Sequence, residues 1–567
     1  MNSVAQTSSP VPACQIAYFS MEYAFVQSLK TYSGGLGFLA GSHMRSARAL
    51  KQPLVAIGIL WKYGYYDQVR KPDQTMDVLF MEKQYSFLEP TNLRFQIRVN
   101  HAPVWVTAYY LPPATFETAP TYFLSTDLPE NDYLAQTICH RLYDPNPETR
   151  ITTSILLGVG GAKLLDLLQL SPDVYHLNES HPLPVAFALY NRFGNAEVVR
   201  KRLVFTTHTP EEAGNPRTDI RLLDRMGFFD YLPLDTVRQL TGIYTDTFNW
   251  ALAALRLAGR ANAVSKRHQE VCQQMWGAYD NLCPIGAITN AQNARFWADE
   301  KMADAVARND NAALVARKKT LKKRLFDVVA DQTGDLFRPD VFTIVWSRRF
   351  AGYKRADLLL ADPARFERLL SNPAYPVQMI WAGKPYPFDY ASIGTFDRLV
   401  HVSKGFANCA VLVDYGMQLS RQLKGGADLW LNTPRLTREA SGTSGMTAAM
   451  NWAVNASTND GWIPEFARNG INSFVLPEAS ITGPVHEQDA FDAENLYALL
   501  ETVVLPLYYE HPDDWTAIMK ASIEDVTPYF DSDRMAAEYA ETMYKINDSP
   551  SAETHNSARP LLTQAPD

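Results

Sequence analysis

The chain has few cysteines, and none of them form a recognisable pair. Its five cysteines are scattered over 567 residues. Their odd number and the lack of a CxxC pair indicate a reducing compartment without a disulfide framework or a structural zinc. The first 29 residues contain no Lys or Arg, and no apolar segment of a secretory signal follows them. We therefore expect a cytoplasmic protein.

Long hydrophobic runs and basic blocks are also missing. No run of about 18 uncharged apolar residues occurs, so neither a transmembrane helix nor a membrane partner is expected. The chain has 53 Lys and Arg against 61 Asp and Glu, a net charge of −8. Because phosphate neutralisation dominates nucleic-acid affinity, this balance argues against a nucleic-acid partner, but it leaves room for pockets that bind small anions. A hydrophobic content of 46% excludes a disordered or fibrous chain.

What is present is an alternation of short apolar runs and longer helical patterns. The apolar runs are QIAYF, PLVAIGIL, VYHLN, LVFTTH, FTIVW, PVQMIWAG and AVLVD, and helical patterns such as ETRITTSILLGVGGAKLLDLL lie between them. This alternation predicts an α/β protein with parallel sheets and helices on both faces. The length favours three to four units, or two large α/β domains.

We expect two Rossmann-like domains that meet near residue 335, where a charged helical stretch at 312–334 gives way to a strand. In open α/β sheets, ligands bind beyond the carboxyl ends of the strands, so the cleft between the domains should hold the site. The expected parts are a disordered N-terminus (1–14), an N-terminal domain (15–300), linking helices (301–335), a C-terminal domain (336–515), returning C-terminal helices (516–546) and a disordered tail (547–567).

A glycine-rich segment is the first that could carry chemistry. Gly34, Gly35 and Leu36 open the run GGLGFLAG, in which glycines let the backbone approach a ligand closely. The run contains a GxGxxA match, but no Asp or Glu lies between Glu22 and Asp67, so a dinucleotide site would lack its ribose-binding acid. An anion or sugar site and a tight turn that opens a helix both stay open.

The densest group of cations follows a strand-like run. Arg348, Arg349, Lys354 and Arg355 lie within eight residues and precede the helical pattern ADLLLADPARFERLL. A helix N-terminus already carries partial positive charge, so cations gathered there are unfavourable without an anion. We interpret this group as a phosphate clamp. A solvated charged loop is the alternative.

Three further segments place polar residues where ligands could bind. Small residues after Glu439 precede a helical run, and their amides could hold an anion or sugar hydroxyls; a plain helix cap is the alternative. Glu179 and His181 follow one apolar run and His208 follows another, where a sheet presents its ligands. The histidine spacing is not a metal motif, and HExxH, GxSxG and Walker motifs are missing, so no metal is expected.

Together these motifs resemble the α-glucan (glycogen/maltodextrin) phosphorylase family, in its short prokaryotic type. The resemblance covers roughly residues 15–545 and rests on ordered motifs that include YFSMEYAF, YSGGLGFLAGSH, HLNESHP, VFTTHTPEEAGN, RRFAGYKRADLL and DLWLNTPRLTREASGTSGM. It implies a GT-B glycosyltransferase fold, two Rossmann-like domains facing a central cleft. It also implies retaining α-glucosyl transfer, in which α-1,4-glucan and phosphate give glucose 1-phosphate.

The resemblance assigns roles to single residues. Arg349 and Lys354 would clamp the phosphate, and His208 would contact the sugar 6-hydroxyl and offer its carbonyl near the anomeric carbon. The implied catalytic residues are His208, Arg349, Lys354 and Glu439. The implied substrate-binding residues are Glu22, Gly34, Gly35, Leu36, Glu179, His181, Ala440, Ser441 and Gly442. The implied residues of a pyridoxal phosphate site are Tyr415, Thr443 and Thr447.

The chain departs from the family at the cofactor lysine. The family's GTSGMK stretch carries the lysine that forms a Schiff base with pyridoxal phosphate, and Thr447 stands in its place here. A hydroxyl cannot form an imine, so we expect the covalent attachment of this cofactor to be lost. Trp452 stands where the family usually has Gly, and its bulk could narrow the cofactor pocket.

Three functions follow from the resemblance and this departure. The first is phosphorolysis of an α-glucan or malto-oligosaccharide. The second is transfer from a sugar nucleotide (ADP- or UDP-glucose) to a glucan, which a vacated cofactor pocket could admit, although Tyr32 stands where related synthases have the lysine of KTGGL. The third is a noncatalytic glucan-binding homologue. The retained residues argue against it, namely Arg349, Lys354, His208 and Glu439. Formation of a homo-oligomer also stays open.

Overall fold

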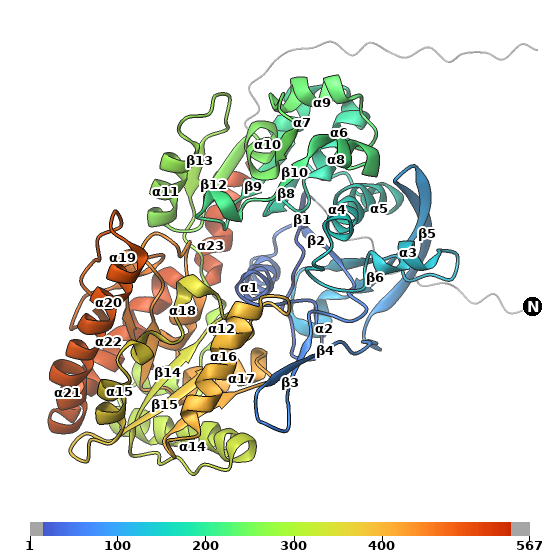
Figure 1. Ribbon diagram of the computed structural model, residues 1–567. Coiled ribbons are helices and arrows are strands. Elements are labelled where there is room, and N and C mark those ends of the chain that lie inside the picture. The colour runs from blue at the N-terminus through green and yellow to red at the C-terminus, as the bar shows by residue number, and fades with distance from the viewer. Residues whose placement is uncertain (1–14, 546–567) are drawn as a thin grey trace, which may run out of the picture.

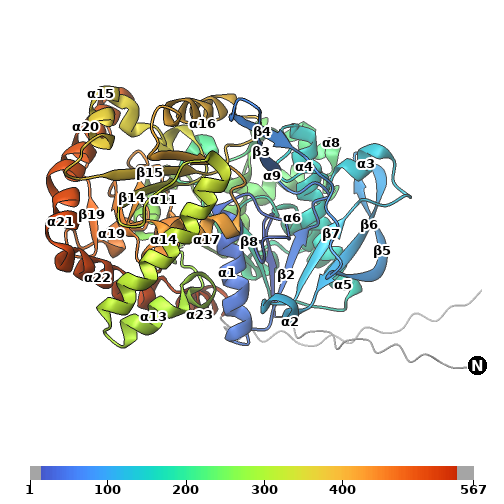
Figure 2. The same ribbon diagram turned by 90° about the horizontal axis from the view of Figure 1, so that it is seen from below.

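The computed structural model describes residues 15–545, and within them the chain is a mixed α/β protein with two large sheets (Figure 1). The disordered ends predicted at 1–14 and 547–567 lie outside the described residues. One sheet is built from the N-terminal part of the chain and the other from the C-terminal part, and helices cover both sheets (Figures 1 and 2).

Within the described residues, the first sheet has nine strands in the order β13-β12-β9-β8-β1-β2-β7-β6-β5. The strands from β13 to β7 pair in parallel, as the apolar runs predict, and β6 and β5 attach antiparallel at the edge. The bounds are β1 Ile16–Phe19, β2 Leu54–Ile59, β5 Glu89–Val99, β6 Ala102–Leu111, β7 Thr121–Ser125, β8 Val174–Asn178, β9 Leu203–Thr206, β12 Arg260–Ala263 and β13 Ile285–Ala287.

The antiparallel edge is an addition to the parallel strands that the sequence predicts. Asn100 and His101 join β5 to β6 with φ of 48° and 64°, the left-handed conformation that tight hairpin turns require. Such a hairpin needs no crossover helix, so it adds two strands without the βα alternation from which a parallel sheet is predicted. Two antiparallel strand pairs lie outside the large sheets: the hairpin of β3 (Asp67–Arg70) and β4 (Met76–Leu79), and β10 (Arg217–Asp219) with β11 (Thr247–Asn249), which α8 (Ile220–Met226) and α9 (Leu234–Thr241) separate in sequence.

The second sheet is parallel throughout the described residues, in the order β16-β15-β14-β17-β18-β19. Counted from β14 this is the doubly wound order 3-2-1-4-5-6. In this order the chain adds strands first on one side of β14 and then, from β17 on, on its other side. The first sheet reverses in the same way between β1 and β8. The bounds are β14 Phe342–Ser347, β15 Val377–Ala382, β16 Cys409–Leu412, β17 Leu429–Asn432, β18 Val454–Ser457 and β19 Ser473–Val475.

The longer helices agree with the sequence pattern. The pattern at 148–168 forms α4 (Pro147–Ile155), a π-helical turn (Leu156–Gly160) and α5 (Gly161–Leu167), and the charged stretch at 312–334 forms α14 (Asn311–Thr333). The other helices are α1 Gly35–Ala49, α2 Pro113–Phe116, α3 Tyr133–Thr137, α6 Pro184–Phe193, α7 Ala196–Arg202, α8 Ile220–Met226, α9 Leu234–Thr241, α10 Trp250–Leu257, α11 Lys266–Trp276, α12 Ala294–Trp297, α13 Glu300–Ala307, α15 Pro363–Leu370, α16 Tyr390–Ser403, α17 Met417–Gly426, α18 Thr443–Ala449, α19 Ile463–Phe466, α20 Val485–Leu499, α21 Leu505–Glu510, α22 Pro512–Phe530 and α23 Ser532–Glu538.

The helix predicted directly after the cation group is interrupted. Two 3-10 turns, Gly352–Lys354 and Leu358–Ala361, follow β14, and α15 begins only at Pro363. Proline suits the first position of a helix and disfavours a helical conformation in the residue before it. The cations therefore do not lie at the N-terminus of an α-helix, and the prediction that a helix dipole demands an anion there is wrong.

The end of the described chain returns to the first sheet. Helix α23 packs against α1, and the Tyr544 hydroxyl lies 2.8 Å from Nδ1 of His176 in β8. Arg260 of β12 also donates to the carbonyl of Met543. A helix long and apolar enough to cross a membrane does not occur between residues 15 and 545.

Candidate active site

A cavity of about 1070 Å³ is lined by residues that follow strands of both sheets. From the first sheet, Glu22 lies beyond β1 and Glu179 beyond β8, the two neighbouring strands between which the strand order of that sheet reverses. From the second sheet, Arg349 lies beyond β14 and Glu439 beyond β17, again on either side of the reversal. Doubly wound sheets bind their ligands at such switch points, because the neighbouring loops diverge there and leave a crevice.

This cavity brings together most of the residues predicted for a site. The cavity wall includes each residue of the predicted catalytic set, namely His208, Arg349, Lys354 and Glu439. It also includes each residue of the predicted substrate set, namely Glu22, Gly34, Gly35, Leu36, Glu179, His181, Ala440, Ser441 and Gly442. Of the residues predicted for a cofactor, Tyr415 and Thr443 line the cavity, whereas Thr447 does not.

Several cations belong to the wall of the cavity. Arg348, Arg349, Lys354 and Lys384 line it together, and Glu439 accepts from Arg348 at 2.8 Å and from Lys354 at 3.0 Å. Arg349 is exposed on the cavity wall, and Lys384 donates to a backbone carbonyl. Nη1 of Arg348 is buried without a hydrogen-bond partner among the described residues. Buried charges need partners, so the part of the cavity beside Arg348 suits an anion.

The surroundings shift the pKa values of these groups. Burial and the neighbouring Arg348 lower the pKa of Lys354 to about 7, although Glu439 opposes this shift. Burial also lowers the pKa of Lys384, to about 8. For Glu439, burial opposes the charge, but Arg348 and Lys354 outweigh it and lower the pKa to about 2. Glu439 is therefore a carboxylate at neutral pH, while Lys354 is close to its midpoint.

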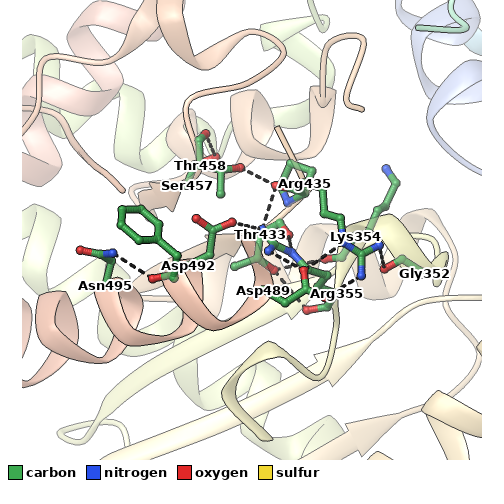
Figure 3. A network of polar contacts seen from close by, with 12 residues as sticks. Gly352, Lys354, Arg355, Thr433, Arg435, Ser457, Thr458, Asp489, Asp492 and Asn495 are labelled. Atoms are coloured by element: carbon green, nitrogen blue, oxygen red, sulfur yellow. Dashed lines mark hydrogen bonds and ion pairs between the residues drawn. The ribbon is translucent and has the colours of Figure 1, made fainter. Parts of the chain in front are cut away.

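The turn that carries Lys354 is fixed through its backbone carbonyls (Figure 3). The N–H of Arg435 donates to the carbonyl of Tyr353 at 2.9 Å, and the hydroxyl of Thr433 donates to that of Lys354 at 3.2 Å. Nη1 of Arg435 lies 3.4 Å from the carbonyl of Gly352. Because the carbonyls are held by residues that follow β17, the backbone of the turn has little freedom to move.

Arg355 belongs to the same network and not to the cavity wall. Its side chain donates to the carbonyl of Thr433 at 2.8 Å, to Asp492 at 2.6 Å and to Asp489 at 3.0 Å (Figure 3). Asp489 also accepts a hydrogen bond from the side chain of Arg435 at 2.7 Å. Arg355 has φ of 50°, a left-handed conformation that persists in a non-glycine residue only where neighbours hold it. Helix α20 thus fixes the turn through Asp489 and Asp492.

His208 and Glu179 form one unit on the first-sheet side. Glu179 accepts the backbone N–H of His208 at 2.5 Å and the hydroxyl of Thr209 at 3.0 Å. Nε2 of His208 donates to Oδ1 of Asn178 at 2.7 Å, which leaves Nδ1 as an acceptor. Burial lowers the pKa of His208 to about 3, so the imidazole is neutral at physiological pH. A neutral, fixed imidazole can hydrogen-bond a sugar hydroxyl without adding charge.

Glu22 holds the glycine-rich loop. Its carboxylate accepts the N–H groups of Ser33 at 2.7 Å and Gly34 at 3.2 Å, and the Tyr143 hydroxyl at 2.6 Å. The Gly34 amide is therefore directed at Glu22. A Cβ on Gly37 would lie 2.5 Å from Cβ of Tyr32, so this glycine is required by packing. The carboxylate of Glu22 therefore holds the conformation of the glycine-rich loop without a ligand.

Comparison with known proteins identifies the relatives of this chain. It is 33% identical to the maltodextrin phosphorylase of Thermococcus litoralis, over 93% of this chain and 70% of that protein. The chain belongs to the glycogen/maltodextrin phosphorylase family. It is also 31% identical to the glycogen phosphorylase of Mycobacterium bovis, with the same coverage, and 46% identical to an uncharacterized protein of Methanocaldococcus jannaschii over 93% and 99% of the two chains. No protein-family model matches the chain.

The structure adds residues to those the sequence predicts for this phosphorylase-family site. Lys384 brings a further cation to the cavity wall, beside Arg348 of the predicted cation group, which pairs with Glu439. Lys384 lies just beyond β15 in the segment WAGKPYP, so the rule that ligands bind at strand ends could have found it. Asn178, the last residue of β8, is needed to orient His208. The sequence carries no signal of that pairing, because Asn178 ends β8 and His208 follows another strand, β9.

The cofactor implied by the family resemblance does not fit position 447 of this phosphorylase-family chain. The hydroxyl of Thr447 is directed at two carbonyls of its own helix, Ser444 at 3.1 Å and Thr443 at 3.4 Å, and the side chain is 1% exposed. Without an amine there, pyridoxal phosphate cannot be attached through this residue. Between residues 15 and 545, no group of three or more His, Cys, Asp or Glu side chains could hold a metal ion.

Proposed function

We propose that this chain transfers α-glucosyl groups, with retention, between an α-1,4-glucan or malto-oligosaccharide and inorganic phosphate, with glucose 1-phosphate as the product of degradation. Membership of the phosphorylase family supports this class of reaction. One observation carries the proposal: Arg348, Arg349, Lys354 and Lys384 face one cavity in which Glu439 pairs with two of them. A phosphate dianion supplies the negative charge that this arrangement lacks.

We also propose the GT-B arrangement, with two Rossmann-like domains at 15–300 and 336–515 that face the cavity. Linking helices at 301–335 and returning helices at 516–546 would complete it. The doubly wound strand orders of both sheets support this arrangement, as does a cavity lined from both. A cytoplasmic location and a homo-oligomer stay predictions from the sequence.

Two carboxylates that line the cavity, Glu439 and Glu179, are poor nucleophiles. Glu439 has a pKa of about 2 because Arg348 and Lys354 hold it, so its lone pairs are engaged. Glu179 accepts hydrogen bonds from His208 and Thr209. A retaining glycosidase needs one free carboxylate to attack the sugar. Retention here is better supported as a front-face reaction, in which phosphate enters on the face from which the glucan leaves.

Phosphate can supply both the nucleophile and the proton of this step. One phosphate oxygen bonds to the anomeric carbon while the bond to the glycosidic oxygen breaks, and the phosphate proton moves to that oxygen, so atoms and charge balance. Arg349 and Lys354 would hold the phosphate and its developing negative charge. His208, neutral and fixed by Asn178, would hold the sugar.

The test is release of glucose 1-phosphate from glucan and phosphate by the purified chain. We expect Arg349→Ala to lower kcat/KM for phosphate by roughly 10- to 100-fold, the value of a hydrogen bond between charged groups. Arg368→Ala, which removes an exposed arginine of α15, is the matched control and should leave kcat/KM unchanged. If the wild-type chain releases no glucose 1-phosphate, with or without added pyridoxal phosphate, the proposed reaction is wrong.

Thr447 favours a second candidate function, because without the cofactor lysine the family's usual route is in question. The cavity, at about 1070 Å³, is at the upper end of the roughly 300–1,000 Å³ usual for ligand pockets, which is room for a sugar nucleotide. Consumption of ADP- or UDP-glucose with an oligosaccharide acceptor would select this function. Glucan binding without turnover of either donor would select a noncatalytic glucan-binding homologue.

A further inference from the structure

A short segment of the cavity wall, residues 439–442, is held through its backbone. The N–H of Glu439 donates to Oδ2 of Asp460 at 2.8 Å, and the N–H of Trp462 donates to the carbonyl of Ser441 at 2.9 Å. Both partners lie between β18 and α19, and both are buried. The second-sheet part of the chain thus fixes this segment near both of its ends.

The carbonyl in the middle of the segment is held from the first sheet instead. The hydroxyl of Ser265 donates to the carbonyl of Ala440 at 2.6 Å. Ser265 follows β12, is completely buried, and does not belong to the cavity wall. Its oxygen also accepts the N–H of His268 at 3.0 Å, as the N-cap of α11. A hydroxyl has one proton and two lone pairs, so its proton stays available for Ala440.

The corner of the chain that carries Ser265 is itself docked on the second-sheet part. Glu465 of α19 accepts the N–H of Lys266 at 2.8 Å and the hydroxyl of Thr289 at 2.7 Å, and its side chain is 5% exposed. Hydrogen bonds to a carboxylate are strong, so they fix the residue next to Ser265. Ser265 therefore has a defined position relative to the segment 439–442.

The direction of the Ala440 carbonyl decides the direction of the next N–H group. The peptide unit between Ala440 and Ser441 is planar and trans, so this carbonyl and the N–H of Ser441 point in opposite directions. Because the carbonyl is turned to Ser265, the N–H of Ser441 is turned away from it. Residues 15–545 offer no acceptor for this N–H and no partner for the buried hydroxyl of Ser441. Since Ser441 lines the cavity, its N–H is available to a ligand there.

We propose that Ser265 is a positioning residue for the sugar: by holding the carbonyl of Ala440, it keeps the N–H of Ser441 directed at a hydroxyl of the glucosyl group. This proposal rests on the proposed function, which puts the glucosyl group beside the segment. A neutral N–H suits a sugar hydroxyl, whereas the phosphate has Arg349 and Lys354. Ser265 therefore matters for ligands that carry the sugar and not for an anion alone.

The test compares two ligands of the purified chain, glucose 1-phosphate and inorganic sulfate, by isothermal titration calorimetry. We expect Ser265→Ala to lower the affinity for glucose 1-phosphate roughly tenfold, the usual cost of a buried carbonyl that loses its donor, and to leave the affinity for sulfate unchanged. Ser265→Gly should have the same effect. Glycine at an N-cap costs a helix little, so this variant removes the hydroxyl while α11 keeps its start.

Asn195→Ala is the matched control. Asn195 is exposed and caps α7 by accepting the N–H groups of Glu197 and Val198, so its loss also weakens the start of a helix, but it does not line the cavity. It should leave both affinities unchanged. If Ser265→Ala and Ser265→Gly bind glucose 1-phosphate as tightly as the wild-type chain, or lose affinity for both ligands alike, Ser265 serves the fold alone and the proposal is wrong.

The proposed reaction would fail in a different way. A wild-type chain that binds glucose 1-phosphate but does not form it from glucan and phosphate refutes the reaction, and the comparison of the two variants still decides on Ser265. A wild-type chain that does not bind glucose 1-phosphate overturns both.

Discussion

Lys354 lies among Arg348, Arg349 and Glu439, and burial lowers its pKa to about 7. Because the shift is downward, the ammonium is present below that pH and is lost as the pH rises through it. We therefore expect affinity for sulfate, which stays a dianion, to fall from about pH 6 to about pH 8. Isothermal titration calorimetry of the wild-type chain measures this dependence.

The control for this titration is Lys354→Arg, whose guanidinium stays charged over the whole range. Its sulfate affinity should vary much less with pH. Lys384, with a pKa of about 8, begins to lose its own charge only at the upper end of the range. An unchanged slope in Lys354→Arg would assign the titration to Lys384 or another group and contradict the prediction.

Replacement of Lys424 by methionine should stabilise the fold. Methionine keeps the length of the side chain and removes an amine that has no acceptor in the described structure, so we expect a gain of about 1–2 kcal/mol in the free energy of unfolding. Because burial lowers the pKa of the folded Lys424, the unfolded lysine binds a proton over part of the pH range in which the folded one has lost it. The gain should thus be larger near about pH 7 than near about pH 10.

Chemical denaturation at both pH values tests this prediction. Lys301→Met, which changes an exposed lysine of α13, is the control and should show no gain. A loss of stability in Lys424→Met at pH 7 would mean that the amine has an ionic partner after all.

At the scale of elements, the turn Gly352–Lys354 is held in place by a helix far away in sequence. Asp492 of α20 is 2% exposed and accepts from Arg355 at 2.6 Å, and Arg355 in turn donates to residues that follow β17. We expect Asp492→Asn to raise KM for phosphate roughly tenfold, with a smaller change in kcat, because Lys354 loses its fixed position. Steady-state kinetics with glucan in excess measure this effect.

Glu501→Gln is the matched control for that prediction. Glu501 forms an ion pair with Arg365 at 2.8 Å. Replacing Glu501 therefore also breaks an arginine–carboxylate pair close to α20, but this pair does not contact the turn Gly352–Lys354. It should leave KM for phosphate unchanged. A variant Asp492→Asn that melts earlier but keeps its KM would show that the network serves stability alone.

Elements with a strong local signal could be predicted from the sequence. VYHLN and FTIVW became the buried strands β8 and β14, because short β-branched and aromatic runs bounded by polar residues fit the interior of a parallel sheet. The helix after the cations could not be predicted, because Pro363 sets its start and the carbonyls before it are held by Arg435 and Thr433. Those partners are some 80 residues away in sequence.

The candidate site shows the same division. The cations and polar residues that end strands were found, since strand ends in doubly wound sheets gather at one edge. Which groups contact one another could not be predicted, because the partners lie in different segments of the chain. Examples are Glu439 with Arg348, Glu22 with the loop at Gly34, and Lys424 with Trp297. Sequence patterns describe which chemistry is available, and the tertiary structure decides which groups neutralise one another.

At the scale of the whole molecule, contacts beside the cavity join the parts of the chain that carry the two sheets. The hairpin of β3 and β4 extends to α16 (Figure 2), where Asp397 accepts the N–H of Met76 at 3.1 Å. Glu211 also forms an ion pair with Arg438, the residue before Glu439. Ligand binding and the closeness of the two sheets should therefore be coupled.

Gln68 of β3 is the residue through which this coupling can be tested. It is 2% exposed, its Nε2 donates to the carbonyl of Gly383 at 3.0 Å, and its Oε1 lies 3.4 Å from the N–H of Tyr415. Gln68→Leu leaves both backbone groups without their partner, at a cost of about 1–3 kcal/mol for each one that stays buried. We expect KM for phosphate and KM for glucan to rise together, severalfold, because both proposed substrates would bind in the cavity that residues of both sheets line. Gln52→Leu, which removes a bond to the carbonyl of Ala536 far from the cavity wall, should lower the melting temperature and leave both KM values unchanged. If Gln68→Leu behaves like Gln52→Leu, the contacts between the sheets only stabilise the fold and do not govern binding.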